Sequence, residues 1–179
     1  GGLQPQLTLN YNSQVVDQAT SITQASWVGM GWSLDTGSIE RYTNDTNGNV
    51  DDTFLLNLNG VSSRIIRDTS GVYHLGDENF WKITYNVASP SSWVVKDKNG
   101  NTYTFGYVST MVYAVGSTNG CGNPDSINTM DYRWELTNVT NIFGQQINYD
   151  YTKEQKNFLW LTGSPGSCTR HTRLTDTAV

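Results

Sequence analysis

A turn of the form Asp/Asn-x-x-Gly, set between two strand-like segments, occurs three times and constrains this chain more than any other feature. The turns begin at Asp68, Asp97 and Asn141, and an aromatic residue follows each of them within a few positions. The Asp or Asn side chain accepts hydrogen bonds from its own turn backbone, and glycine takes the left-handed conformation that closes a hairpin. This degenerate repeat predicts successive antiparallel hairpins.

The segments between the turns have the period-two patterning of strands. Residues 7–11 alternate apolar and polar side chains. Phe54, Leu56 and Leu58 again place apolar side chains at every second position, before Asn59-Gly60, a strong hairpin signal. We therefore expect an all-β fold in which antiparallel hairpins form a curved, twisted sheet with little or no helix. Whether that sheet is an open spiral, a sandwich or a barrel stays open.

Other segments lack a clear period. Residues 12–26 are polar and predict a surface loop, and residues 116–131 predict a long Gly/Asn-rich loop that interrupts the repeat. The length of 179 residues suits one domain. We expect a single β-rich domain over residues 1–162 and a loop or tail over residues 163–179.

The chain has two cysteines, Cys121 and Cys168, which both lie in Gly/Ser-rich segments. They are either two free thiols or one disulfide that tethers the C-terminal tail. The chain has little lysine and much Asn, Thr and Trp. This composition is typical of a secreted protein, and it therefore favours the disulfide.

The charge balance narrows the classes of partner. The net charge of −5 and the isoelectric point near 4.8 argue against nucleic acid, which requires a basic surface. No apolar run approaches the roughly 18 residues of a membrane-spanning helix, so we expect no membrane span.

Alternating oxygen-bearing side chains make the best candidate metal site. They are Asp45, Asn47, Asn49 and Asp51, and such a set suits calcium. The spacing departs from the EF-hand loop, because Gly48 falls at the fourth position and no Glu follows at the twelfth. The alternative is an Asn-Gly hairpin tip with solvated acids, and we expect no other cofactor.

Few residues could carry catalysis. The two histidines, His74 and His171, fit a strand position and a polar tail, and only Cys168 beside His171 suggests a dyad. No Gly-x-Ser-x-Gly motif, zinc spacing or phosphate-binding glycine loop is present. We therefore expect a protein that is not an enzyme, with a hydrolase as the least favoured alternative.

The tryptophans leave a second alternative open. Their side chains could stack on sugars, as in an extracellular β-sandwich that binds carbohydrate or protein. Four of the tryptophans lie at strand or hairpin positions, where core packing is the favoured role. They are Trp27, Trp32, Trp93 and Trp134.

The opening of the chain resembles the N-terminal region of bacterial RHS/YD-repeat proteins, as in RHS polymorphic toxins and the B component of insecticidal toxin complexes. The similar segments are GLQPQLTLNYNS (2–13), VGMGWSL (28–34), GSIER (37–41), DTFLL (52–56), Asp97-x-x-Gly100-x-x-Tyr103-x-Phe105-Gly106, Trp134-x-Leu136-x-x-Val139, Gly144 and Tyr149-Asp150-Tyr151.

This resemblance implies a secreted or cell-surface bacterial protein with a structural role. In that family, hairpin repeats spiral into a hollow shell around a toxic or unfolded cargo, and the N-terminal segment helps begin or seal the shell. It implies that Gly29, Gly31 and Trp32 shape the backbone. The partners would be the remainder of the same polypeptide, or like chains, joined through β-edges. The loop over 116–131 and the two cysteines depart from the family pattern, and nothing matches its self-cleaving aspartate motif.

Overall fold

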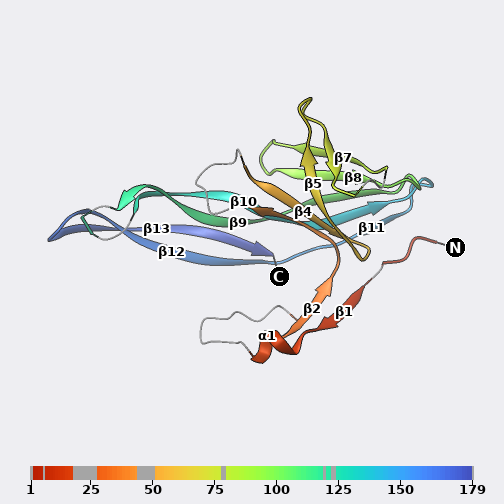
Figure 1. Ribbon diagram of the computed structural model, residues 1–179. Coiled ribbons are helices and arrows are strands. Elements are labelled where there is room, and N and C mark those ends of the chain that lie inside the picture. Colours follow the sequence, from red (N-terminus) through yellow and green to blue (C-terminus); the bar gives the residue numbers. More distant parts are fainter. Residues whose placement is uncertain are drawn as a thin grey trace.

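The computed structural model describes residues 2–5, 7–17, 28–43, 51–77, 80–118, 120–121 and 124–178. This part of the chain is built almost entirely from antiparallel strands, so the predicted all-β class is confirmed (Figure 1). In chain order the elements are β1 (Thr8–Tyr11), α1 (Ser13–Asp17), β2 (Trp32–Asp35), β3 (Ser38–Tyr42), β4 (Thr53–Leu58), β5 (Val61–Arg67), β6 (Tyr73–Leu75), β7 (Lys82–Asn86), β8 (Ser92–Lys96), β9 (Thr102–Thr118), β10 (Pro124–Thr140), β11 (Gln146–Asn148), β12 (Lys153–Ser164) and β13 (Ser167–Ala178).

Eight consecutive strands close into a ring, which resolves the topology that the sequence left open. From β3 to β10, each strand pairs antiparallel with the next one along the chain, and β10 then pairs back with β3. The closing register joins Arg133 to Glu40, Trp134 to Ile39 and Glu135 to Ser38. Short β11 adds to the same β10 strand further along. A closed ring has no open edges within it.

The three Asp/Asn-x-x-Gly turns have the predicted geometry. In the turn that begins at Asp97, the Oδ1 atom accepts hydrogen bonds from the N–H groups of Asn99 and Asn101 at 2.8 and 2.9 Å. Gly100 lies at a φ of +84° and donates its N–H to the Asp97 carbonyl at 3.0 Å. The turns that begin at Asp68 and Asn141 repeat this pattern.

The predicted Asn-Gly hairpin is also present. Asn59 and Gly60 form the two-residue loop between β4 and β5, and their φ angles are +52° and +77°. Two positive φ angles identify the type I′ turn that matches the twist of the strands beside it.

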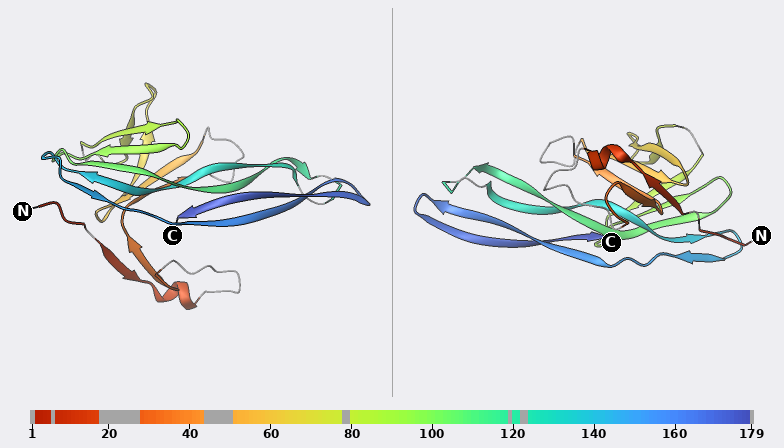
Figure 2. Two further views of the ribbon diagram at one scale, coloured as in Figure 1. Left: turned by 180° about the vertical axis from the view of Figure 1, so that it is seen from behind. Right: turned by 90° about the horizontal axis from the view of Figure 1, so that it is seen from below.

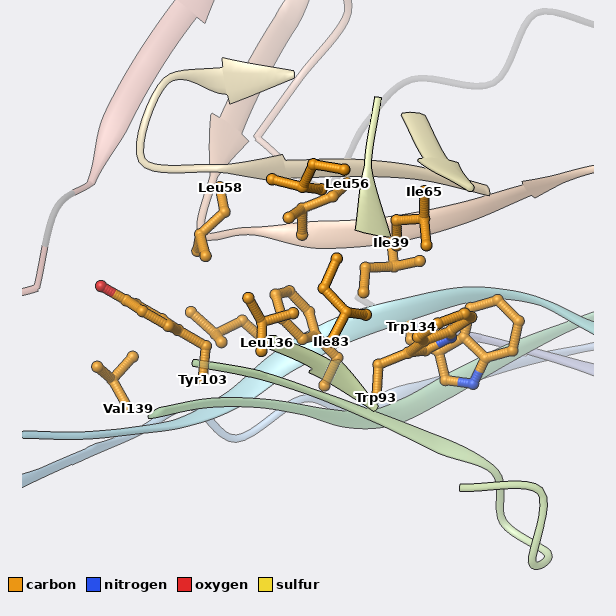
Figure 3. Close-up of a cluster of buried hydrophobic side chains, with 13 residues drawn as sticks. Ile39, Leu56, Leu58, Ile65, Ile83, Trp93, Tyr103, Trp134, Leu136 and Val139 are labelled. Carbon is orange, nitrogen blue, oxygen red and sulfur yellow. The ribbon is translucent and has the colours of Figure 1, made fainter. Parts of the chain in front are cut away.

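Alternation along the ring strands places one set of apolar side chains inside (Figure 3). Trp93, Trp134 and Phe105 are fully buried there, so core packing is confirmed for these two tryptophans. The remaining members of the core are Ile39, Leu56, Leu58, Ile65, Leu75, Ile83, Val95, Tyr103, Leu136 and Val139.

Two long ribbons extend from the ring side by side (Figures 1 and 2). In the first, β9 and β10 continue past the strands that they pair with in the ring, and there they pair with each other. We call residues 108–118 with 124–131 the β9–β10 arm. The second ribbon is the two-stranded β12–β13 hairpin, and β13 lies against β9. The β1–β2 hairpin forms a separate two-stranded sheet and a third ribbon, which projects from another side of the ring (Figure 1).

The loop predicted over residues 163–179 differs from the structure. Strand β12 reaches Ser164, Pro165-Gly166 forms the turn, and β13 pairs along the whole of β12. The period-two signal depends on one buried face. Residues 163–170 are exposed on both faces, so this part of the hairpin gives no such signal. The division into a domain over 1–162 and a tail stays a prediction.

Two other predicted loops are shorter than expected. Strand β9 runs to Thr118 and β10 begins at Pro124, so most of the predicted loop over 116–131 is paired strand. The predicted loop over 12–26 contains the five-residue helix α1 in its described part. Among the described residues, no helix has the length and apolar character needed to cross a membrane.

Candidate functional site

The structure does not bring a calcium site together in its described part. Asp45, Asn47 and Asn49 lie outside the described residues, and Asp51 is exposed at the start of the segment that leads into β4. Within the described ranges, no group of three or more His, Cys, Asp or Glu residues could hold a metal ion. The calcium site stays a prediction.

The two cysteines are joined, as the sequence favoured. Cys121 lies at the tip of the β9–β10 arm and Cys168 lies beside the turn of the β12–β13 hairpin, with a Cα–Cα distance of 6.0 Å. The disulfide therefore links the tips of the two long ribbons (Figure 1). Because Cys168 is bonded to Cys121, it has no thiol to form the suggested dyad with His171.

His74 is part of a turn network. Its Nε2 lies 2.9 Å from Oδ2 of Asp68. The other carboxylate oxygen, Oδ1, accepts hydrogen bonds from the backbone N–H groups of Ser70 and Val72. The His74 contact, followed by the Ser70 hydroxyl and the backbone donors, holds the pKa of Asp68 well below its usual range. His74 therefore lies in strand β6, as predicted, and its contact with Asp68 helps to hold the turn in place.

The buried indole of Trp134 has a specific polar partner. Its Nε1 donates to the Ser91 hydroxyl at 2.9 Å, and Ser91 donates in turn to Oδ2 of Asp131. Trp32 lies instead on the β1–β2 hairpin, 40% exposed, with its ring centroid 4.8 Å from that of Tyr11. Trp27 lies outside the described residues.

A cavity opens at the end of the ring where β3, β5 and β7 finish and β4 and β6 begin. It has a volume of about 310 Å³. The inward-facing positions along these strands change here from aliphatic to charged and aromatic, as from Ile39 to Arg41 along β3. The lining residues are Arg41, Asp52, Phe54, Ile65, Arg67, Tyr73, Tyr85 and Val87. We call this cavity the ring mouth.

The polar centre of the ring mouth is the pair Arg41 and Asp52. Their Nε and Oδ2 atoms are 3.5 Å apart, and the Asp52 side chain is only 2% exposed. Neither Asp52 oxygen accepts a hydrogen bond from the described residues. Burial raises the pKa of Asp52, and the Arg41 charge opposes that shift. The Arg41 guanidinium also lies over the rings of Phe54 and Trp134, at 5.3 and 5.5 Å from their centroids.

The opposite end of the ring has a smaller cavity, and the polar groups there bond to one another. Tyr103 donates its hydroxyl to Oδ2 of Asp97 at 3.2 Å and accepts a hydrogen bond from Nδ2 of Asn59 at the same distance. Leu3 of the N-terminal segment packs against the core there, and a cavity of about 170 Å³ remains. The two ends of the ring therefore differ in what they offer a ligand.

Charged side chains bridge the seam where the ring closes. Arg133 of β10 forms ion pairs with Glu40 on β3 and with Glu135 on its own strand. Burial raises the pKa of Glu135, and Arg133 opposes that rise. The contact between Arg133 and Glu40 joins residues that are 93 positions apart in the chain.

Neither Arg41 nor Asp52 stands out in the sequence as a candidate site residue. The sequence signal for both residues is their position: each is a charged residue that continues the alternation of inward-facing side chains along its strand. This can be recognised only when the closed ring shows which face of each strand points inward. The chain matches no protein-family model, and a comparison with curated proteins finds no match.

Proposed function

We propose that this chain is a non-catalytic structural segment of a secreted RHS/YD-like shell, in which its ribbons pair with neighbouring parts of the same polypeptide or with like chains. The observation that carries the proposal is the contrast between a closed ring and three two-stranded ribbons outside it. A two-stranded sheet has outer edges on which further strands can form.

Exposed apolar side chains on the ribbons support this role. On the β1–β2 hairpin, Leu7, Leu9 and Tyr11 are each more than half exposed. On β12, Leu159 is 45% exposed. Isolated two-stranded hairpins are marginally stable in water, and contiguous apolar surface marks an interaction site. A neighbouring sheet would both cover these side chains and stabilise the hairpins.

The ring then has a distinct part in the shell. Its interior is filled with large apolar side chains, so it encloses no cargo itself. It serves instead as a rigid support from which the ribbons project. The N-terminal segment reaches from the β1–β2 hairpin to the end of the ring opposite the mouth, where Leu3 packs.

The disulfide is compatible with an extracellular location, where such bonds persist. A secreted bacterial protein is the setting that we propose. The disulfide would keep the two long ribbons aligned where no reducing agent opens them.

Amide hydrogen exchange on the full chain tests the proposal, measured at low and at high protein concentration. Ring amides should be protected at both concentrations, because every ring strand has two partners. Amides of β1, β2 and β12 should exchange within minutes in dilute solution and gain protection as concentration rises. Ribbon amides whose exchange is independent of concentration up to the solubility limit would contradict strand pairing between chains.

A further inference from the structure

The ring mouth presents buried polar groups without hydrogen-bond partners, which is rare in a folded protein. At the mouth these atoms are both oxygens of Asp52 and Nε of Arg41. Nε1 of Trp93 is a further such atom in the described structure, and its ring packs 4.4 Å from that of the lining residue Tyr85. At the other end of the ring, comparable groups are satisfied by each other. The unpartnered atoms of Asp52 and Arg41 therefore lie where the ring is hollow.

The Arg41–Asp52 pair suits a group that donates and accepts at once. The 3.5 Å between Nε and Oδ2 is an ion-pair contact, and the hydrogen-bonding capacity of both atoms remains unused. A ligand hydroxyl can donate its proton to the Asp52 carboxylate and accept one from the Arg41 guanidinium. Neighbouring hydroxyls on one ring would use both Asp52 oxygens.

Aromatic walls surround this pair. Phe54, Tyr73 and Tyr85 all line the mouth, and the Tyr85 ring lies 6.3 Å from each of the other two. Small-ligand sites have this composition, with apolar and aromatic walls and a few polar groups that fix orientation. The volume of about 310 Å³ accommodates a sugar ring with its substituents.

The ring mouth also carries a guanidinium group that is not paired with a carboxylate in the described residues. Arg41 faces Asp52, which leaves Arg67 as a second guanidinium on the rim, over the Tyr73 ring at 5.8 Å. Among the described residues no carboxylate forms an ion pair with Arg67. A guanidinium in this position matches a ligand carboxylate, which it binds in a bidentate manner.

We propose that the ring mouth binds an acidic saccharide, with Asp52 and Arg41 on its hydroxyls, Arg67 on its carboxylate and the tyrosines against its ring. This activity goes beyond the structural role proposed above and does not depend on it. A shell segment without sugar binding and a sugar-binding domain without assembly are both physically possible, so the two proposals fail separately.

Calorimetric titration of the full chain tests the site with named probes. Trigalacturonate, a hyaluronan tetrasaccharide and 3′-sialyllactose serve as acidic probes, and maltotriose and lactose as neutral ones. At least one acidic probe should bind at least tenfold more tightly than either neutral probe. Asp52→Asn and Arg67→Gln should each weaken that binding about tenfold, as expected for loss of a charged hydrogen-bonding group. Asp150→Asn, an exposed substitution outside the mouth, should leave it unchanged.

Three results would overturn the proposal. They are no heat of binding for any acidic probe at millimolar concentration, equal binding of acidic and neutral probes, and binding that both mouth variants leave intact. Arg67 is exposed, so its substitution keeps the test valid if the Asp52 variant is unstable. Circular dichroism of each variant confirms that the fold is retained.

Discussion

At the residue scale, single polar atoms decide the conformation of the hairpins and the packing of the core. In the turn that begins at Asn141, one side-chain oxygen accepts two backbone N–H groups, from Phe143 and Gln145, both at 3.0 Å. The same device occurs at Asp68 and Asp97. This level was predictable from sequence, because each turn is closed by residues within five positions of one another.

Gly144→Ala tests the turn geometry. Gly144 lies at a φ of +76°, and a Cβ there would meet nothing within 4 Å, so the cost is backbone strain alone. We expect a loss of about 1–2 kcal/mol in the free energy of unfolding, measured by urea denaturation. Gly76→Ala is the control, since Gly76 lacks a positive φ and its Cβ would make ordinary contacts. Equal losses in the two variants would contradict the explanation.

Ser91→Ala tests the polar partner of the buried indole. The substitution leaves Nε1 of Trp134 without an acceptor in the core, which costs about 1–3 kcal/mol of stability. Ser62→Ala, at an exposed position on β5, should be close to neutral in the same urea experiment. A Ser91 variant as stable as the Ser62 variant would show that this hydrogen bond contributes nothing.

The lowered pKa of Asp68 predicts a pH dependence. A carboxyl whose pKa is lower in the folded state stabilises the fold above its unfolded pKa of about 4, and the effect is lost as the pH falls. The wild-type protein should therefore lose more stability than Asp68→Asn between pH 6 and pH 2. Thermal unfolding across that range measures the difference, and parallel curves would rule out this contribution.

At the element scale, the ribbons depart most from what the sequence indicated. Residues 167–178 form a full strand, although their sequence is largely polar and carries no amphipathic pattern. Backbone pairing across Pro165-Gly166 and the link at the tips hold this strand in place. By contrast, β4 and β5 were predictable, because a type I′ turn joins two segments that each bury one face.

The disulfide should stabilise the ribbons through the length of chain that it closes. Cys121 and Cys168 are 47 positions apart, and the entropy of a loop of that length corresponds to at most about 4 kcal/mol. We expect the double variant Cys121→Ser/Cys168→Ser to lose a large part of that value in urea denaturation. A reducing agent should destabilise the wild type similarly and leave the variant unchanged. Insensitivity of the wild type to reduction would contradict a stabilising role.

At the scale of the whole molecule, closure of the ring was beyond prediction from sequence. The seam pairs β3 with β10 across almost a hundred intervening residues, and no local pattern encodes such a contact. The curvature of the same sheet forms the ring mouth, whose lining comes from β3, β5, β6 and β7, from the start of β4 and from Asp52 just before it. Local turn chemistry thus predicts the hairpins, while the site depends on their long-range order.

The central claim is that the ring is self-contained and that the ribbons carry association. Multi-angle light scattering of the isolated chain across a concentration series tests it most directly. Leu9→Lys charges an exposed apolar position of the β1–β2 hairpin, and Ile66→Lys charges an equally exposed position on the ring strand β5. We predict that the wild type and the Ile66 variant self-associate as concentration rises, whereas the Leu9 variant stays closer to the monomer mass of 19.9 kDa. A wild-type chain that remains monomeric throughout, or a Leu9 variant that associates as the wild type does, would contradict the account.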